Sequence, residues 1–496
     1  MLWRGKKSLR LATTGGNLTF AAATQDITSP PSYITYLSSS PLPPKLCSLP
    51  LSSSLHQRYQ DTRETHLGPP PSSRSFNPLS LPHHQPTQLR SSSEHNPAIM
   101  ATEEKEIDYT LNNPDTLTKY KTAAEISEKV LAAVKELCVA GEKISDICGK
   151  GDQLLEEEIS KVWRGKKVSK GFAHPTTVSP SSYVTPYTPL KTDEKEAAIE
   201  LQEGEPVKIQ LGAQIDGFPS IVCDTIIVPA KDKKTDVIEG KTADLMLATH
   251  YANELLLRLM LPPGTLASGS EEEKAKAAAA KPKTQAQIND LVQKIAKSYD
   301  VSIVESTTSW LFARNEIEDK KKIVLAPGEG SKGDGTPEIG EVWGVEIGMS
   351  SGSGKVKQLD QRSTLHRRTA QQYGLKRPTS RKIYSEAQKK FGLFPFSLRQ
   401  FEDEKDAKTG VVECVRSGVF RQYELVGDKD NAPVVRTWTT VAITKNGITK
   451  LGGPSAWDLT KFKTDNKITD EEILKILELP IAKNKGKKKK KTTTEA

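Results

Sequence analysis

The segment from Lys208 to Val228 has the sequence KIQLGAQIDGFPSIVCDTIIV and contains the clearest fold signal in the chain. Two short apolar runs, Val207–Leu211 and Val222–Val228, flank the turn-forming pair Asp216-Gly217. Branched apolar residues favour strands, and a glycine between two such runs is typical of a hairpin turn. The sequence therefore predicts a β-hairpin, and the other segments are interpreted around it.

Helical periodicity occurs on both sides of this hairpin. Asn113-Pro114-Asp115 predicts a helix start, the apolar spacing continues to Leu137, and Gly141 is a typical residue after a helix end. Further helices are predicted from Ser145, from Ala243 to the stop at Pro262-Pro263-Gly264, and over Thr284–Tyr299. The Ala/Lys/Glu run Glu271–Lys283 fits either a solvated helix or a disordered insert. Helices and strands together indicate an α/β (α+β) fold.

The composition limits the class of protein. The chain has 496 residues, 35% of them hydrophobic, so we expect part of it to lie outside any packed core. No apolar run reaches about 18 residues, which argues against a membrane span. The five cysteines form no CxxC pair, and we interpret them as reduced, buried thiols of a cytosolic or nuclear protein.

Positive charge is concentrated in two segments. Residues 355–390 carry eleven Lys and Arg residues against Asp360 and Glu386, and the tail from Ile481 carries seven Lys against Glu495. The whole chain has a formal net charge of only +9, so the remainder is acidic overall. Such a distribution favours a polyanionic partner over a general contribution to solubility.

The first hundred residues predict no fold. Residues 1–106 are rich in Ser and Pro and lack periodic apolar runs. The opening twenty residues are basic and free of acidic side chains, which is weakly similar to a mitochondrial transit peptide. Met100 is followed by a sequence typical of a protein start, so our preferred interpretation is an extension from an upstream start codon.

The hairpin pattern K-I-x-[LF]-G-x-x-I-x-G resembles that of the pita-bread metallo-aminopeptidases, the methionine aminopeptidases of type II. The segment EVWGVE, which ends at Glu346, resembles another strand of that family. The resemblance implies a pita-bread domain over residues 107–453 with a basic insert near 355–390. A disordered extension, 1–106, would precede it and a Lys-rich tail, 454–496, would follow.

This resemblance also implies that the metal site has been lost. Four of the family's five metal-ligand positions are occupied here by Gln210, Ile221, Trp310 and Trp438, and only Glu346 remains. The family's catalytic histidine falls on Pro186. A dinuclear hydrolase needs several carboxylates and a histidine around two cations. We therefore expect no metal, no cofactor and no peptidase activity, with the two indoles filling the former cavity.

Two longer motifs resemble a non-catalytic branch of the same superfamily. YGLK-x-x-TSR from Tyr373, and F-S-L-R-x-FEDEK with GVVEC downstream of Pro395, are similar to the proliferation-associated, ErbB-receptor-binding family. Fungal members of that family are described as curved-DNA-binding proteins. The resemblance implies binding to rRNA and to large ribosomal subunits, with residence in the cytoplasm, nucleus and nucleolus. A monomer that does not bind membranes is expected.

The basic segments supply the candidate RNA contacts. In the first segment they lie around Tyr373 and Tyr384, and a predicted turn at Arg377–Ser380 would display them; in the tail they form an uninterrupted run. The predicted contacts are Arg367, Arg368, Lys376, Arg377, Arg381, Lys382, Lys487, Lys488, Lys489, Lys490 and Lys491. Cations neutralise phosphates, and planar groups stack on bases. The alternatives are a solvated charged loop, a binder of curved or structured DNA, and a residual metallo-aminopeptidase.

Overall fold

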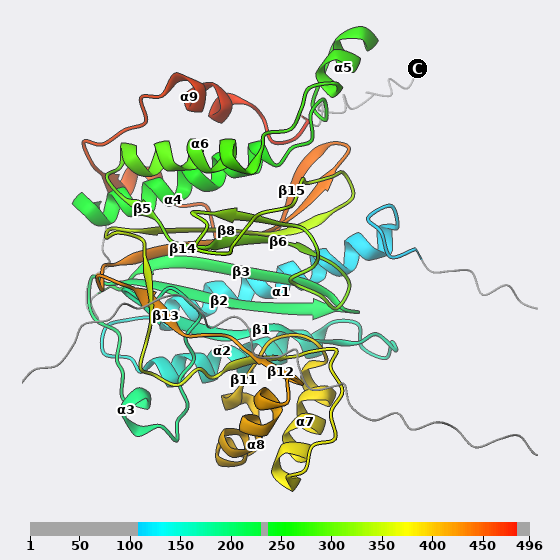
Figure 1. The fold of residues 1–496 in the computed structure, drawn as a ribbon, viewed down its shortest axis with the longest axis vertical. Coiled ribbons are helices and arrows are strands. Elements are labelled where there is room, and N and C mark those ends of the chain that lie inside the picture. Colours follow the sequence, from blue (N-terminus) through cyan, green and yellow to red (C-terminus); the bar gives the residue numbers. More distant parts are fainter. Residues whose placement is uncertain (1–107, 230–236, 484–496) are drawn as a thin grey trace, which may run out of the picture. The chain divides into compact units, whose positions relative to one another are not determined.

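A nine-stranded sheet forms the framework of the computed structural model (Figure 1). The structure describes residues 108–229 and 237–483, all within the unit Met100–Ala496. The strand order is β1-β2-β3-β14-β8-β6-β7, with β15 beside β14 and β5 beside β8. The strands are β1 Lys170–Pro180, β2 Pro206–Ile215, β3 Phe218–Ile227, β5 Ser302–Ile303, β6 Thr307–Phe312, β7 Lys322–Leu325, β8 Val342–Ser350, β14 Val434–Thr444 and β15 Gly447–Gly452.

The predicted hairpin is confirmed as β2 and β3. Its turn consists of Asp216 and Gly217, with φ of +54° and +81°. Two successive left-handed residues produce the turn that matches strand twist, which explains the Asp-Gly pair. Both strands are longer than predicted because almost all of their residues are buried, whether apolar or polar.

Four helices pack on one face of the sheet, over its two halves (Figure 1). The helices α1 Pro114–Leu137 and α2 Ile144–Lys161 cover β1, β2 and β3, and α4 Gly240–Leu259 and α6 Gln285–Ser298 cover the half that contains β5, β7, β8 and β14. These four confirm the predicted helices. Residues Glu271–Ala278 form α5, a solvated helix with a capping box from Ser270 and Glu273. Among the described residues, no helix is both long and apolar enough to cross a membrane.

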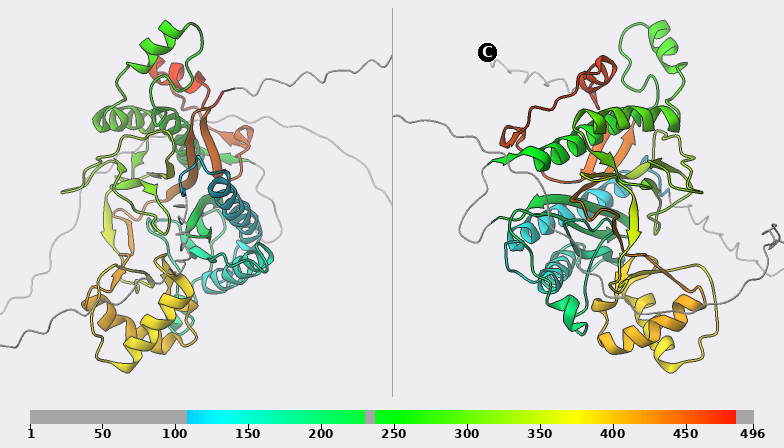
Figure 2. Two further views of the ribbon diagram at one scale, coloured as in Figure 1. Left: turned by 90° about the vertical axis from the view of Figure 1, so that its right-hand side faces the viewer. Right: turned by 60° about the vertical axis from the view of Figure 1, so that its left-hand side comes forward.

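The basic insert near 355–390 is a folded part of the domain. It contains β9 Val356–Gln358, β10 Leu365–Arg368 and α7 Pro378–Phe391, followed by α8 Glu404–Arg416. Figure 2 shows α7 and α8 packed side by side. The predicted turn at Arg377–Ser380 is wrong, because Pro378 is the first residue of α7, a position where proline loses no hydrogen bond.

Smaller elements complete the fold: α3 Glu194–Ala197, β4 Ile238–Glu239, β11 Phe396–Ser397, η1 Leu398–Gln400, β12 Phe420–Gln422, β13 Val426–Asp428, η2 Leu459–Lys461, β16 Phe462–Lys463 and α9 Glu471–Glu478.

The C-terminal boundary predicted at 453 is too early. The Trp457 indole donates a hydrogen bond to the buried Asp224 carboxylate at 2.9 Å, and β16 pairs with β4. Ile473 of α9 is fully buried in the core that contains α4 and α6. Residues 454–483 therefore belong to the domain. The predicted extension 1–106 and the run Lys487–Lys491 lie outside the described residues.

This boundary is testable with one buried and one exposed residue of α9. Ile473→Ala removes apolar contacts in the core, so we expect a loss of about 2–5 kcal/mol in the free energy of unfolding. Leu474→Ala, at a side chain that is 42% exposed, should change it little. Urea unfolding of the full chain measures both. Equal effects of the two substitutions would contradict the packing of α9 on the domain.

Candidate functional site

The positions that sequence comparison places at the family's metal site all line one cavity of about 450 Å³. They come from five strands of the large sheet and from the loop after β1. They are Gln210 on β2, Ile221 on β3, Trp310 on β6, Glu346 on β8, Trp438 on β14 and Pro186 in the loop. The prediction that these six residues share one site is consistent with this arrangement.

Strand register explains why they converge. Gln210 pairs with Cys223, Cys223 pairs with Trp438, and Trp438 pairs with Glu346, so these four residues form a row across β2, β3, β14 and β8. Directly paired residues in antiparallel strands extend to the same face. The row therefore lies on one face of the sheet centre, from which Gln210, Trp438 and Glu346 line the cavity.

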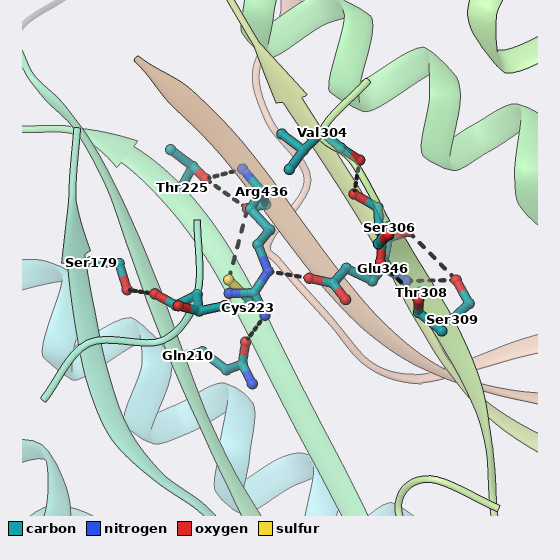
Figure 3. A network of polar contacts seen from close by, with 12 residues as sticks. Ser179, Gln210, Cys223, Thr225, Val304, Ser306, Thr308, Ser309, Glu346 and Arg436 are labelled. Atoms are coloured by element: carbon teal, nitrogen blue, oxygen red, sulfur yellow. Dashed lines mark hydrogen bonds and ion pairs between the residues drawn. The ribbon is translucent and has the colours of Figure 1, made fainter. Parts of the chain in front are cut away.

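Arg436 is the central residue of this site, and the sequence analysis did not identify it. It lies two residues before Trp438 on β14 and is 5% exposed. Its Nε donates to a carboxylate oxygen of Glu346, and its Nη2 donates to the side-chain oxygen of Gln210 (Figure 3). The guanidinium thus lies between two of the family's ligand positions.

Backbone bonds fix the position of Arg436. The Thr225 hydroxyl on β3 accepts from the Arg436 amide at 2.9 Å and donates to the Arg436 carbonyl at 2.6 Å. Burial opposes the positive charge, but attraction from Glu346 outweighs it, and the pKa of Arg436 is raised. The site therefore contains a permanent cation that belongs to the protein.

Burial lowers the pKa of two other basic groups near the site. Burial, with a smaller contribution from the charge of Arg436, lowers the pKa of His174 to about 3, although its hydrogen bond to the Pro175 carbonyl opposes the shift. Burial likewise lowers the pKa of Lys208 to about 7. His174 lines the cavity as a neutral ring, whereas Arg436 lines it as a cation. Arg421 lines it as a second cation and pairs with Glu318 at 2.6 Å.

A pair of divalent cations does not fit these residues. An amide, an aliphatic chain and two indoles replace four ligands, and the remaining carboxylate of Glu346 is engaged by Arg436. Within residues 108–229 and 237–483, no group of three or more His, Cys, Asp and Glu side chains could hold a metal ion. The positive charge that metals supply in such a site comes here from a guanidinium.

The two indoles do not fill the cavity, which corrects the expectation from sequence. Trp438 stacks on Phe312, with ring centroids 6.4 Å apart, and packs over Gly344. Trp310 lies at the wall, with the Lys322 ammonium 5.3 Å from its ring centroid. Both rings form walls and leave the space between them open.

The six predicted RNA contacts of the folded segment do not form one free cluster. Arg367 is buried and forms ion pairs with Glu316 at 2.7 Å and Glu318 at 3.6 Å. Arg368 donates to the Gly392 carbonyl and lies over the Tyr384 ring. Arg367 is therefore a structural residue of β10, and its predicted exposure to RNA is wrong.

The other four predicted contacts are exposed, but acidic groups surround them. Lys382 pairs with Asp406 at 2.6 Å. Glu413 accepts the backbone amides of Lys376 and Arg377, and Arg381 donates to nearby carbonyls. Asp406 and Glu413 of α8 thus lie next to these residues, and among the described residues Lys382 forms an ion pair with Asp406. RNA contact by these four residues stays a prediction.

Comparison with known proteins establishes the family. Residues 118–356 match metallopeptidase family M24. The chain is 39% identical over 400 residues to the curved DNA-binding protein of Schizosaccharomyces pombe, covering 80% of this chain and 98% of that protein. The chain belongs to the M24 family. It is also 33% identical over 396 residues to ErbB-3 binding protein 1 of Solanum tuberosum, covering 78% of this chain and 94% of that protein.

A solved M24-type structure agrees with the fold. The structure of a thermophilic Arx1 is 71% identical and superposes with a TM-score of 0.74, covering 75% of this chain and all of that one. The pita-bread resemblance and the resemblance to curved DNA-binding and ErbB-binding relatives are therefore confirmed. The M24 match ends before β14, which carries Arg436 and Trp438. Alternation along β14 places Arg436 on the face of Trp438, and this signal could have identified it.

The pairing of Arg436 with Glu346 predicts an asymmetric response to substitution. Arg436→Met leaves a largely buried carboxylate without its partner, so we expect a loss of about 3–5 kcal/mol in the free energy of unfolding. Adding Glu346→Gln should recover much of that loss, because no uncompensated charge remains. Urea unfolding of both variants measures this difference.

An exposed pair is the matched control. Lys274→Met breaks the solvated pair with Glu271 and should change the stability by less than about 1 kcal/mol. If the double variant at 436 and 346 is as unstable as Arg436→Met alone, the ion pair is not the reason for the loss.

Proposed function

We propose that this chain is a catalytically inactive M24-fold protein that binds rRNA in the large ribosomal subunit. The first part of this proposal, catalytic inactivity, rests on the Arg436 guanidinium. Glu346 and Gln210, at two metal-ligand positions, hold this group. A guanidinium stays protonated and cannot activate a water molecule as a bound metal does. The site therefore retains the geometry of the fold without the means of hydrolysis.

The distribution of charge supports the second part of the proposal, binding to rRNA. The tail from Ile481 carries seven lysines against one acidic residue, and positive charge on an otherwise acidic chain attracts a polyanion. The name of the Schizosaccharomyces pombe relative describes a nucleic-acid binder. On this proposal the protein works in the cytoplasm and in the nucleus or nucleolus, during assembly of the subunit or during translation.

Structured or curved DNA is the second candidate ligand. It is favoured by the name of the same relative, and phosphate contacts alone do not separate RNA from DNA. A residual metallo-aminopeptidase is the third candidate. The loss of carboxylates at Gln210 and Ile221 and the engaged Glu346 argue against it.

Inactivity predicts no response to metals. The full chain, titrated calorimetrically with Co²⁺ or Mn²⁺, should show no saturable binding at micromolar metal, and it should release no methionine from a Met-Ala-Ser peptide. The physical reason is that one engaged carboxylate cannot hold two cations. Stoichiometric metal binding that Glu346→Gln abolishes, together with methionine release, would establish the third candidate.

RNA binding predicts saturable co-sedimentation of the full chain with purified large ribosomal subunits. Affinity should fall steeply as salt rises from about 50 to about 200 mM, because counterions are released from phosphates on binding. Competing duplex RNA should displace the protein at lower concentration than bent duplex DNA of equal length. The reverse order would favour the DNA candidate, and a lack of co-sedimentation even at low salt would contradict ribosome binding.

A further inference from the structure

The cavity of about 450 Å³ contains hydrogen-bonding groups that the protein itself leaves unused. Glu346 bonds to Arg436 through one carboxylate oxygen, and its other oxygen has no donor among the described residues (Figure 3). Gln210 bonds to the same guanidinium through its side-chain oxygen, and its Nε2 has no acceptor in the described part of the chain. Because Glu346 and Gln210 share one guanidinium, an unused acceptor and an unused donor lie close together in this cavity.

His174 supplies a second acceptor to the same cavity. Its side chain lines the cavity, and the residue is 3% exposed. Its Nδ1 lies 2.8 Å from the Pro175 carbonyl oxygen. A carbonyl only accepts hydrogen bonds, so Nδ1 carries the proton and Nε2 carries the lone pair. No donor among residues 108–229 and 237–483 bonds to Nε2, and the ring therefore offers a buried, neutral acceptor.

The charges around the cavity favour a neutral ligand. Glu346 is paired with Arg436, and Glu318 is paired with Arg421 at 2.6 Å. Glu424 accepts hydrogen bonds from two glutamine amides and forms no ion pair with a described residue. An anionic ligand would be repelled by Glu346 and Glu424, and a cationic ligand would lie beside Arg436. A charge that is buried without a partner costs more than a neutral group that forms hydrogen bonds.

The remaining walls suit a flat apolar group. Aliphatic side chains of Ile221 and Ile317 and the indoles of Trp310 and Trp438 line the cavity. Aromatic rings contribute large apolar surfaces and pack well against other planar groups. The volume lies within the range of roughly 300–1,000 Å³ that is typical of sites for small molecules. The cavity therefore combines a few polar groups with an apolar enclosure.

We propose that this cavity binds a small neutral molecule that carries a primary carboxamide on a flat apolar body. A primary carboxamide has two N–H donors and one carbonyl acceptor. The N–H groups donate to the free oxygen of Glu346 and to Nε2 of His174, and the carbonyl accepts from Nε2 of Gln210. A carboxylate has no donor for the first two groups, and an amidinium has no acceptor for the third. This inference goes beyond the proposed function and does not involve RNA.

The test uses three planar compounds of nearly equal shape and different charge: benzamide, benzoate and benzamidine. The full chain is titrated with each compound by calorimetry at neutral pH in the presence of EDTA. His174→Phe removes one acceptor, and Thr308→Trp places an indole at a position that lines the cavity. The matched control, Thr409→Trp, adds the same group at an exposed position of α8. Thermal unfolding shows whether each variant is folded.

We expect the wild type to bind benzamide at least about tenfold more tightly than either charged analogue, because each analogue loses hydrogen bonds of one kind. His174→Phe and Thr308→Trp should each weaken benzamide binding about tenfold, while Thr409→Trp matches the wild type. A preference for benzoate or benzamidine overturns the proposal, as does a lack of benzamide binding at millimolar concentration.

Unchanged benzamide binding by a folded Thr308→Trp variant would place the ligand elsewhere and also overturns the proposal. If Thr308→Trp does not fold, His174→Phe decides by the same criterion. These titrations contain no nucleic acid, so their failure leaves the proposed RNA binding intact, and a failure of co-sedimentation with large subunits leaves the carboxamide site intact.

Discussion

The ion pair between Arg436 and Glu346 holds the centre of the large sheet together. Removing charges from water costs several kcal/mol for each ion, and only good geometry with further hydrogen bonds offsets that cost. The geometry here includes bonds from the guanidinium to Glu346 and Gln210, and reciprocal bonds from the Thr225 hydroxyl to the Arg436 backbone. Strands β2, β3, β14 and β8 are thereby joined through side chains as well as through their ladders, at the place where an M24 hydrolase joins them through metal ions.

In this site a guanidinium lies among the family's metal-ligand positions, and the cavity beside it remains. A cavity of about 450 Å³ remains, because Trp310 and Trp438 pack along its walls and not across it. The positive charge of Arg436 belongs to its side chain and is balanced by Glu346. On the proposed function, the fold serves as a rigid platform, and RNA binding uses surfaces outside this cavity.

Local sequence patterns were sufficient for the hairpin and for the long helices. The Asp216-Gly217 turn and the helix start at Asn113 depend on neighbouring residues, and both lie where they were predicted. Arg436 and the burial of Arg367 depend instead on partners distant in the chain. Glu346 lies 90 residues before Arg436, and Glu316 lies 51 residues before Arg367. No window of sequence contains both members of either pair, so neither pair was predicted.

Partners distant in the chain also explain why a count of basic residues along the sequence did not show which of them stay unpaired. The window 355–390 is strongly basic in sequence, but folding pairs Arg367 with Glu316 and Lys382 with Asp406. In the connection from α2 to β1, carbonyls at the end of α2 hold Arg164 and Lys170 without neutralising them. A polyanion is attracted by the charge that remains after such intramolecular pairing. That charge depends on partners distant in the chain, so a count along the sequence does not give it.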